Sequence, residues 1–452
     1  MKKLLSIVGL AAGLAYATET RVMTMGYAPE FIQDEFLVLR YPSVITQAQS
    51  MYLFELGDVS MALRYAGVFW TGGEAETGRQ GLGLYLRRNT LLEGLEGVAP
   101  TYPQPELGFG LVGGKSFGSI SLGAGIYYSQ ESDKTETDTT FPTTIGNDTF
   151  NLKTTDDFTT SNITFMLGGT LRYGNGSFAD LSLGYAMHGY NSTYTEEGRL
   201  TYIDPADSTP RIDRYYYKAW EEADGASSAT FNMRAFHFLN EKFALIPAFG
   251  FRMDNYSTVT PDDTTYEHWI FPDSSWSDPS ESRYNVENKG TNIGFGLGFN
   301  LYPTEGMTVM AGLSGDIFAR DHNLKWHHDT ASTDSTYTDT LQNTSLKRVA
   351  FVTGAEVPVF SWLSIRGAMK KTLGGQITTE TTLDYHDGRP SDKTTETITI
   401  PDDFQYWIGL GIRVGSFRLD GNLDPTFLYH GFYALGGDDN IGFLNVSAAY
   451  TF

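Results

Sequence analysis

The chain has no cysteine, comparatively few positive charges and no long hydrophobic run, and each shortage excludes a class of protein. Without cysteine, neither a disulfide framework nor a thiolate metal site can form. Lys and Arg total 32 against 54 Asp and Glu, so the net charge is -22. A chain this acidic makes a poor partner for nucleic acid, which needs clustered cations to neutralise its phosphates. No apolar run approaches the about 20 residues that a membrane-spanning helix requires.

Glycine and aromatic residues are abundant, with 49 Gly, 27 Tyr and 29 Phe. From Ile293 to Leu301, large apolar residues occupy every second position, and the positions between them hold three glycines and Asn300. Runs with the same alternation occur at 119–129, 242–254 and 404–414. Such alternation predicts β-strands with one greasy face and one small or polar face.

The first residues, MKKLLSIVGLAAGLAYA, have the three parts of a secretory signal peptide. Lys2 and Lys3 supply the positive start, a short apolar stretch follows, and Ala15-Tyr16-Ala17 forms a small-x-small cleavage site. We expect cleavage after Ala17. No cysteine follows this site, which excludes a lipoprotein anchor.

Short and long connections alternate along the predicted strands. The short ones are tight turns such as Phe117-Gly118 and Gly415-Ser416. The long ones are polar and span roughly 131–158, 191–227, 257–289, 321–345, 375–403 and 421–440. This alternation places all short turns at one end of an up-and-down meander and all long loops at the other. It predicts an all-β protein, a transmembrane antiparallel up-and-down β-barrel of about 14–16 strands with short periplasmic turns and long extracellular loops.

The number of apolar faces decides which way this barrel is turned. A barrel of so many strands encloses a lumen too wide for side chains to fill, so the apolar faces cannot all point inward. If they face lipid instead, the small and polar faces line a watery interior, and closure leaves no unpaired backbone edge in the membrane. The sequence therefore predicts an inside-out barrel.

The predicted organisation is a signal peptide at 1–17, a short segment at 18–49 and the barrel at 50–452. The strand number is 14 if the wall begins near Arg79, and 16 if Met51–Leu56 and Val59–Trp70 also belong to it; we favour 16. The segment at 18–49 is either a periplasmic lead-in, which we favour, or a plug inside the lumen.

The last strand ends on an aromatic residue and has apolar residues at every second position before it: Leu444, Val446, Ala448, Tyr450 and Phe452. This pattern resembles the C-terminal targeting strand of Gram-negative outer-membrane proteins. The resemblance implies the outer membrane as location, with membrane lipid, lipopolysaccharide and the insertion machinery as partners, and it leaves oligomerisation open. The hairpin layout resembles porins and FadL-type long-chain fatty-acid transporters. The Asn-Pro-Ala signature of the latter is absent, so none of that family's gating or ligand residues is carried over.

Charged residues on the small face of the strands should line the lumen, because an Arg or Lys facing the middle of the membrane costs about 2–4 kcal/mol. Either these cations favour anionic or polar solutes, or they pair with lumenal carboxylates or an inserted segment; we slightly favour pairing. The pore-lining candidates are Arg64, Arg87, Arg172, Arg234, Arg252, Asp254, Asp316, Arg320, Glu356, Arg366, Lys370, Arg413 and Arg418.

No motif indicates catalysis, a cofactor or a metal site. The Gly-Lys-Ser of GFGLVGGKSFG lacks the upstream glycine of a phosphate loop and leads into a strand. His188 near an outer strand end has no partner that the sequence singles out. We therefore expect a non-enzymatic channel or porin-like transporter for small solutes. The alternatives are a structural or surface-interaction barrel without an open pore and, with less support, an outer-rim hydrolase. An open lumen would favour a porin, and a lumen filled by residues 18–49 would favour gated hydrophobic uptake.

Overall fold

The computed structural model of the 452-residue chain describes most of the sequence after its first residues. The described residues are 19–26, 28–57, 62–73, 78–88, 107–142, 149–203, 210–270, 274–330, 333–385, 390–400, 403–423 and 443–452. Nearly all of them belong to one antiparallel sheet. The strands are β1 (Met51–Gly57), β2 (Ala62–Gly72), β3 (Gln80–Arg88), β4 (Leu107–Phe117), β5 (Ile120–Pro142), β6 (Thr149–Tyr173), β7 (Ser177–Ile203), β8 (Pro210–Asn240), β9 (Phe243–Ile270), β10 (Ser274–Leu301), β11 (Thr308–Thr330), β12 (Thr333–Phe360), β13 (Leu363–Tyr385), β14 (Asp392–Ile400), β15 (Phe404–Val414), β16 (Phe417–Leu423) and β17 (Phe443–Thr451).

The sheet closes on itself, because β1 pairs with β2 on one side and with β17 on the other. β14 and β15 both pair with the same side of β13, one beyond the other, so together they make one interrupted strand of the wall. The closed barrel therefore has 16 strands, as the sequence favoured, and β1 and β2 belong to the wall.

The barrel wall is apolar on the outside, as predicted. In β10, Phe295 and Leu297 are 46% and 56% exposed, whereas Gly296 and Gly298 between them face the lumen and are buried. Tyr450 of β17 and Phe452 directly after it point outward, while Ser447 and other inward residues of β17 are buried. The side chain of Leu444 lies outside the described residues. A closed wall with its apolar face outward is the architecture of an outer-membrane β-barrel. The chain is therefore a protein of the outer membrane.

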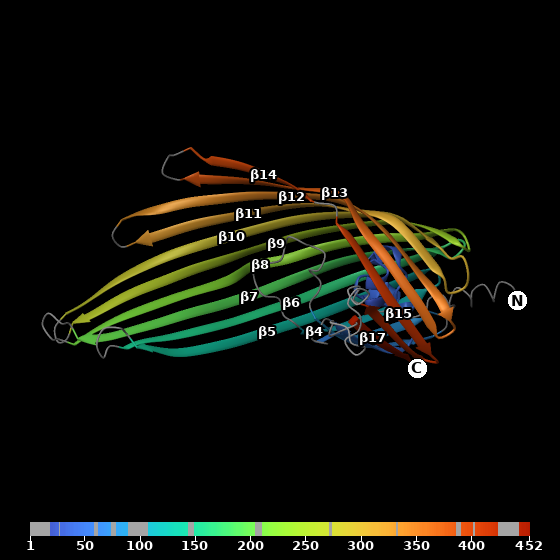
Figure 1. Ribbon diagram of the computed structural model, residues 1–452, viewed down its shortest axis with the longest axis horizontal. Coiled ribbons are helices and arrows are strands. Elements are labelled where there is room, and N and C mark those ends of the chain that lie inside the picture. Colours follow the sequence, from blue (N-terminus) through green and yellow to red (C-terminus); the bar gives the residue numbers. More distant parts are fainter. Residues whose placement is uncertain are drawn as a thin grey trace, which may run out of the picture.

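The wall is much taller on one side than on the other. β5 to β13 are 23 to 31 residues long, whereas β1 to β4 and β15 to β17 have 7 to 11. About 9–11 residues of a tilted strand cross a bilayer, so the long strands continue well past the membrane as one curved sheet (Figure 1).

This outer sheet corrects the prediction of long polar loops. Most described residues of 131–158, 191–227, 257–289, 321–345 and 375–403 are strand. The alternation is lost there because both faces meet water, so no hydrophobic pattern marks the strands. Threonine and tyrosine still favour extended backbone, and each strand has a neighbour to pair with. Most of 421–440 lies outside the described residues.

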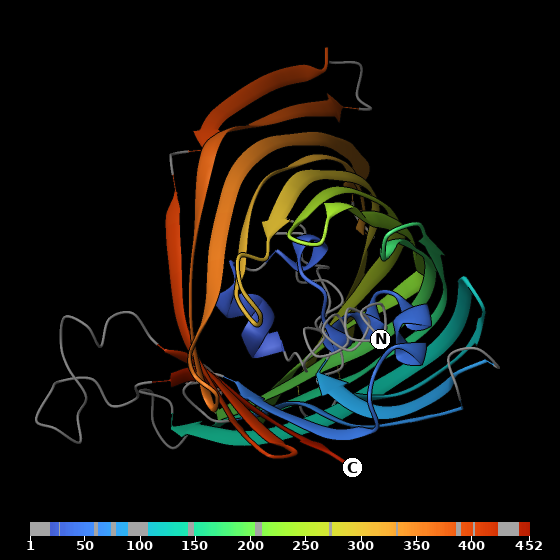
Figure 2. The ribbon, with the colours of Figure 1, turned by 90° about the vertical axis from the view of Figure 1, so that its right-hand side faces the viewer.

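In the described part of the chain, four short helices lie inside the barrel and not in its wall (Figure 2). They are α2 (Glu19–Thr24), η1 (Pro29–Phe31), η2 (Glu35–Leu39) and η3 (Pro42–Thr46). Helices this short do not form stably on their own, so their conformation depends on packing against the wall. Among the described residues, no helix has the length and apolar character needed to span a membrane.

Candidate functional site

Residues 19–26 and 28–49, here called the plug, lie inside the barrel near the end with the short turns (Figure 2). η3 packs against β4, β5 and β6 on one side of the lumen, and α2 packs against β15, β16 and β17 on the other. The sequence favoured a periplasmic lead-in for this segment, and the structure places it in the lumen instead. The missed signal was composition, because side chains such as Phe31, Val38 and Ile45 are too apolar for a solvated lead-in and are fully buried here.

Two apolar clusters hold the plug against opposite parts of the wall. In the first, Val38, Leu39, Ile45 and Ala48 of the plug meet an inward-facing wall set: Met51, Leu53, Tyr65, Phe69, Tyr85, Val112, Tyr127 and Ala449. In the second, the plug contributes Val22, Met25, Ala28, Phe31 and Ile32, and the wall contributes Phe236, Phe238, Ala244, Ile246, Met310 and Val352. An inner wall with large apolar patches is unusual for a water-filled pore, and here the plug covers both patches.

The glycines of the inner wall make room for the plug. The ring of Phe31 lies on β10 and β11, where a Cβ added to Gly298 or Gly312 would approach it to 2.8 or 2.6 Å. Pro42 makes the same close approach to Gly123 and Gly168. The bare face seen in the sequence is therefore a seat for the plug and not simply the lining of an open pore.

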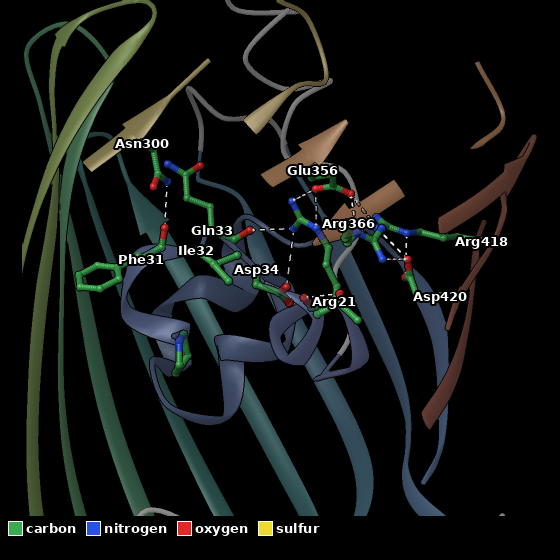
Figure 3. A network of polar contacts seen from close by, with 12 residues as sticks. Arg21, Phe31, Ile32, Gln33, Asp34, Asn300, Glu356, Arg366, Arg418 and Asp420 are labelled. Atoms are coloured by element: carbon green, nitrogen blue, oxygen red, sulfur yellow. Dashed lines mark hydrogen bonds and ion pairs between the residues drawn. The ribbon is translucent and has the colours of Figure 1, made fainter. Parts of the chain in front are cut away.

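An ion network ties α2 of the plug to β12, β13 and β16 (Figure 3). Arg21 Nη2 lies 2.7 Å from Glu356 Oε2, and Arg21 Nη1 lies 3.7 Å from Asp34 Oδ2. Arg366 Nε lies 2.8 Å from Glu356 Oε1. On the far side, Asp420 Oδ1 is 2.6 Å from Arg366 Nη1.

The network closes with Arg418, whose Nε is 2.9 Å from Asp420 Oδ2. The network contains three guanidinium groups and three carboxylates, so its positive and negative charges are equal in number. All six residues are buried. Burial alone would lower the pKa of Arg21, but the adjacent carboxylates of Glu356 and Asp34 outweigh burial and raise it. Removing Arg21 would leave an uncompensated buried carboxylate, and this is the costly way to break such a network.

A second anchor lies across the lumen, where Arg234 of β8 holds the plug backbone. Arg234 Nη1 donates to the carbonyl oxygens of Pro29 and Ile32 at 3.0 and 2.6 Å. Its Nη2 lies 3.0 Å from Asp180, and its guanidinium stacks 4.8 Å from the ring centre of Tyr41. The guanidinium of this wall arginine therefore binds the plug through two backbone carbonyls and one aromatic ring.

Other polar contacts fix the plug at single points around the wall. Asn300 Nδ2 donates to the carbonyl oxygen of Phe31 at 2.9 Å, and the hydroxyl oxygens of Ser43 and Thr170 are 2.8 Å apart. A cavity of about 30 Å³ remains between Asp34 of the plug and Arg234 of the wall. It has room for about one or two water molecules.

The predicted pore-lining residues divide into three groups. Arg234, Glu356, Arg366 and Arg418 contact the plug or its ion network. The next group makes contacts within the wall: Arg172 with Ser121, Arg252 with Asp254, Asp316 with Arg348, and Arg320 with Asn288.

The third group comprises the four remaining candidates. Lys370 is half-buried on β13, and Arg413 is exposed near the end of β15. Arg64 and Arg87 lie in β2 and β3, with side chains outside the described residues.

Asp254, Asp316 and Glu356 are among the predicted lumenal residues, and each pairs with an arginine. Two other acidic partners of wall arginines, Asp180 and Asp420, are not among them. Asp420 lies two residues from Arg418, so strand alternation could have placed both on the inward face. Asp180 of β7 lies directly opposite Arg234 of β8. This partnership could be found only from the pairing register of the two strands. Arg21 and Asp34 are not among the predicted lumenal residues, because the sequence favours a periplasmic lead-in for the segment that contains them.

No known family model and no curated protein sequence matches the chain. Among solved structures, it is similar to the toluene transporter TodX of Pseudomonas putida, at 10% identity over 93% of this chain and 94% of that one, with a TM-score of 0.34. It is also similar to the ferric-catecholate import receptor Fiu of Escherichia coli, at 9% identity, 90% and 82% coverage, and a TM-score of 0.26. The siderophore receptor PirA of Acinetobacter baumannii matches at 6% identity, 89% and 80% coverage, and a TM-score of 0.23. Similarity at this level carries no argument about function.

Proposed function

We propose that this protein is a gated outer-membrane transporter for small solutes, in which the N-terminal plug is the gate. The observation that carries the proposal is the packing of the plug into glycine-lined seats, where two apolar clusters and a neutral buried ion network hold it. A solute crosses when the plug shifts or leaves, and an open porin at rest is not supported.

The plug is built to be held by the wall and not by itself. Its helices have between three and six residues, too short to persist alone. Separating Arg21 from Glu356, or Arg234 from the plug carbonyls, therefore loosens the whole segment. The apolar wall that the plug covers is used in holding it, so it supports a gate more directly than it supports a hydrophobic solute.

A reversible tether between plug and wall tests the gate. Because the chain has no cysteine, the pair Ser43→Cys and Thr170→Cys would form a single defined disulfide, at hydroxyl positions now 2.8 Å apart. In planar bilayers or in liposome-swelling assays, we expect the oxidised protein to be closed and the reduced protein to conduct or transport. Each single cysteine variant is the control.

Two results would count against the gate. Equal transport by the oxidised and reduced double variant would show that plug movement is not needed. No transport by any form, including one with residues 19–49 deleted and the barrel still folded, would favour a structural or surface-interaction barrel.

The outer sheet supports that surface-interaction barrel as a second candidate. β8 alone has 31 residues, about three times the length needed to cross the membrane. If the outer sheet serves a partner, shortening it would abolish cell-surface binding and leave the reconstituted barrel unchanged.

A further inference from the structure

A row of polar side chains runs around the inner wall beyond the plug. In register across neighbouring strands, Ser129 of β5 faces Asn162 of β6, and Asn162 faces His188 of β7. Further along, Ser228 of β8 faces Asp254 of β9. The row continues through Gly290 of β10 to Arg320 of β11. These seven residues, with the adjacent Arg252, Asn288 and Asn292, are called the polar belt below.

The belt lies outward of the plug on the same strands. On β9, the plug reaches Gly250 through Arg40, and Asp254 lies four residues further out. On β6, the plug reaches Gly168 through Pro42, and Asn162 lies six residues further out. A solute arriving from outside would therefore meet the belt before the gate.

Several belt atoms are buried and have no hydrogen-bond partner among the described residues. Asn162 and Asn288 are each 1% exposed, and the Nδ2 of each is unpaired. Asn288 Oδ1 accepts from Arg320 at 2.6 Å, which leaves its Nδ2 as the free donor. Ser129 Oγ, His188 Nδ1 and Asn292 Oδ1 are unpaired as well. Buried polar groups are normally satisfied, because leaving one unpaired is costly.

The backbone is distorted at the same place. β8 carries an extra residue relative to both neighbouring strands between Asp224 and Ser227, directly before Ser228. Such bulges re-aim side chains and occur next to functional sites. Ser228 Oγ lies 2.8 Å from His188 Nε2. Since no carboxylate contacts His188 Nδ1 in the described part of the chain, this pair is not arranged like a catalytic triad.

The unpaired atoms and the charges together define a ligand class. Asn162 and Asn288 offer donors, Asn292 offers an acceptor, and Ser129 and His188 can do either. Arg252 Nη2 is paired with Asp254 Oδ1 at 2.8 Å, and the guanidinium of Arg320 donates to the neutral Asn288 Oδ1, so the belt presents mostly neutral hydrogen-bonding groups. We propose that the polar belt is a binding site for a neutral polyhydroxylated solute such as a saccharide, whose hydroxyls donate and accept at once.

Binding to the belt does not require the plug to move, so it can be tested apart from the gate. The experiment is calorimetric titration of the folded, detergent-solubilised full chain with maltotriose. Gluconate serves as the anionic probe and octanoate as the apolar one. We expect maltotriose to bind, and to bind equally to the oxidised Ser43→Cys/Thr170→Cys protein. Asn162→Ala and Asn288→Ala should each weaken binding about three- to tenfold, the effect of one lost hydrogen bond.

Asn422→Ala is the matched control, because Asn422 is also 1% exposed with an unpaired Oδ1 but lies on β16 away from the belt. It should leave the affinity unchanged. If Asn162→Ala does not fold, as judged by heat-modifiable gel mobility, His188→Asn replaces it. Absence of maltotriose binding, tighter binding of gluconate or octanoate, or an equal loss in Asn422→Ala would overturn the proposal. Loss of binding only in the tethered protein would also overturn it, whatever the fate of the gate.

Discussion

Arg21 and Glu356 lie 2.7 Å apart inside the barrel, although 335 residues separate them in the sequence. This contact joins the first helix of the plug to β12 of the wall. Glu356 also contacts Arg366, so one carboxylate joins the plug to the neighbouring wall strand β13. If the plug is the gate proposed above, these buried ionic contacts help to keep it closed.

Arg21→Gln should loosen the plug. The substitution removes one positive charge from a balanced buried network, and breaking a buried pair in this way costs about 3–5 kcal/mol. That cost falls on the plug, because Arg366 and Arg418 still hold the wall carboxylates. We expect more frequent channel opening in bilayer recordings, with an unchanged barrel by circular dichroism. Arg40→Gln is the control, because it loses a 2.7 Å hydrogen bond to neutral Asn232 and a contact with the Tyr41 ring but no ion pair with a buried carboxylate, and equal behaviour of the two variants would contradict the role of Arg21.

Gly298→Ala should displace the plug from its seat on β10. The new methyl group would lie 2.8 Å from the Phe31 ring, and overpacking of this kind costs about 1–3 kcal/mol. Gly294→Ala is the control on the same strand and the same face, because a Cβ there meets nothing within 4 Å. Protease accessibility of the plug reports the difference. In a Phe31→Ala background, Gly298→Ala should cause no further increase in protease accessibility, and a further increase there would argue against a direct contact.

Leu297→Arg should destabilise the barrel in a membrane. Leu297 points outward in the membrane-crossing part of β10 and is 56% exposed, so the arginine would face lipid at a cost of about 2–4 kcal/mol. Urea unfolding in lipid vesicles measures this cost. Ser132→Arg, at an exposed position of β5 in the outer sheet, should cost almost nothing. Equal stability of the two variants would mean that Leu297 does not meet lipid.

Removing residues 131–158 should leave the barrel intact. The described parts of this range, 131–142 and 149–158, form the outer halves of β5 and β6, whereas the pairs from Ile120 with Leu171 to Gln130 with Ser161 close the wall below them. We expect heat-modifiable gel mobility and channel activity like those of the full chain, because the deleted hairpin stands in water. Failure of the shortened chain to form a barrel would show that the outer sheet is needed for closure.

The sequence by itself determined the fold class, the direction of the wall and the location. The reason is local: a strand repeats every two residues, so alternation such as that from Ile293 to Leu301 fixes which side chains meet lipid. Turn residues between such runs fix the meander, and Tyr450 and Phe452 mark its last strand. None of these inferences needs to know which residues touch across the lumen.

Only the tertiary structure decided what fills the lumen. The glycines at 296, 298 and 312 could line an open pore as well as a seat, and the choice depends on Phe31, which is more than 250 residues away in the sequence. The partners of Arg21 and Arg234 were hidden for the same reason, since ion pairs across a closed barrel leave no periodic trace in the chain. The outer sheet was not predicted either, because strands with water on both faces show no alternation of apolar and polar residues.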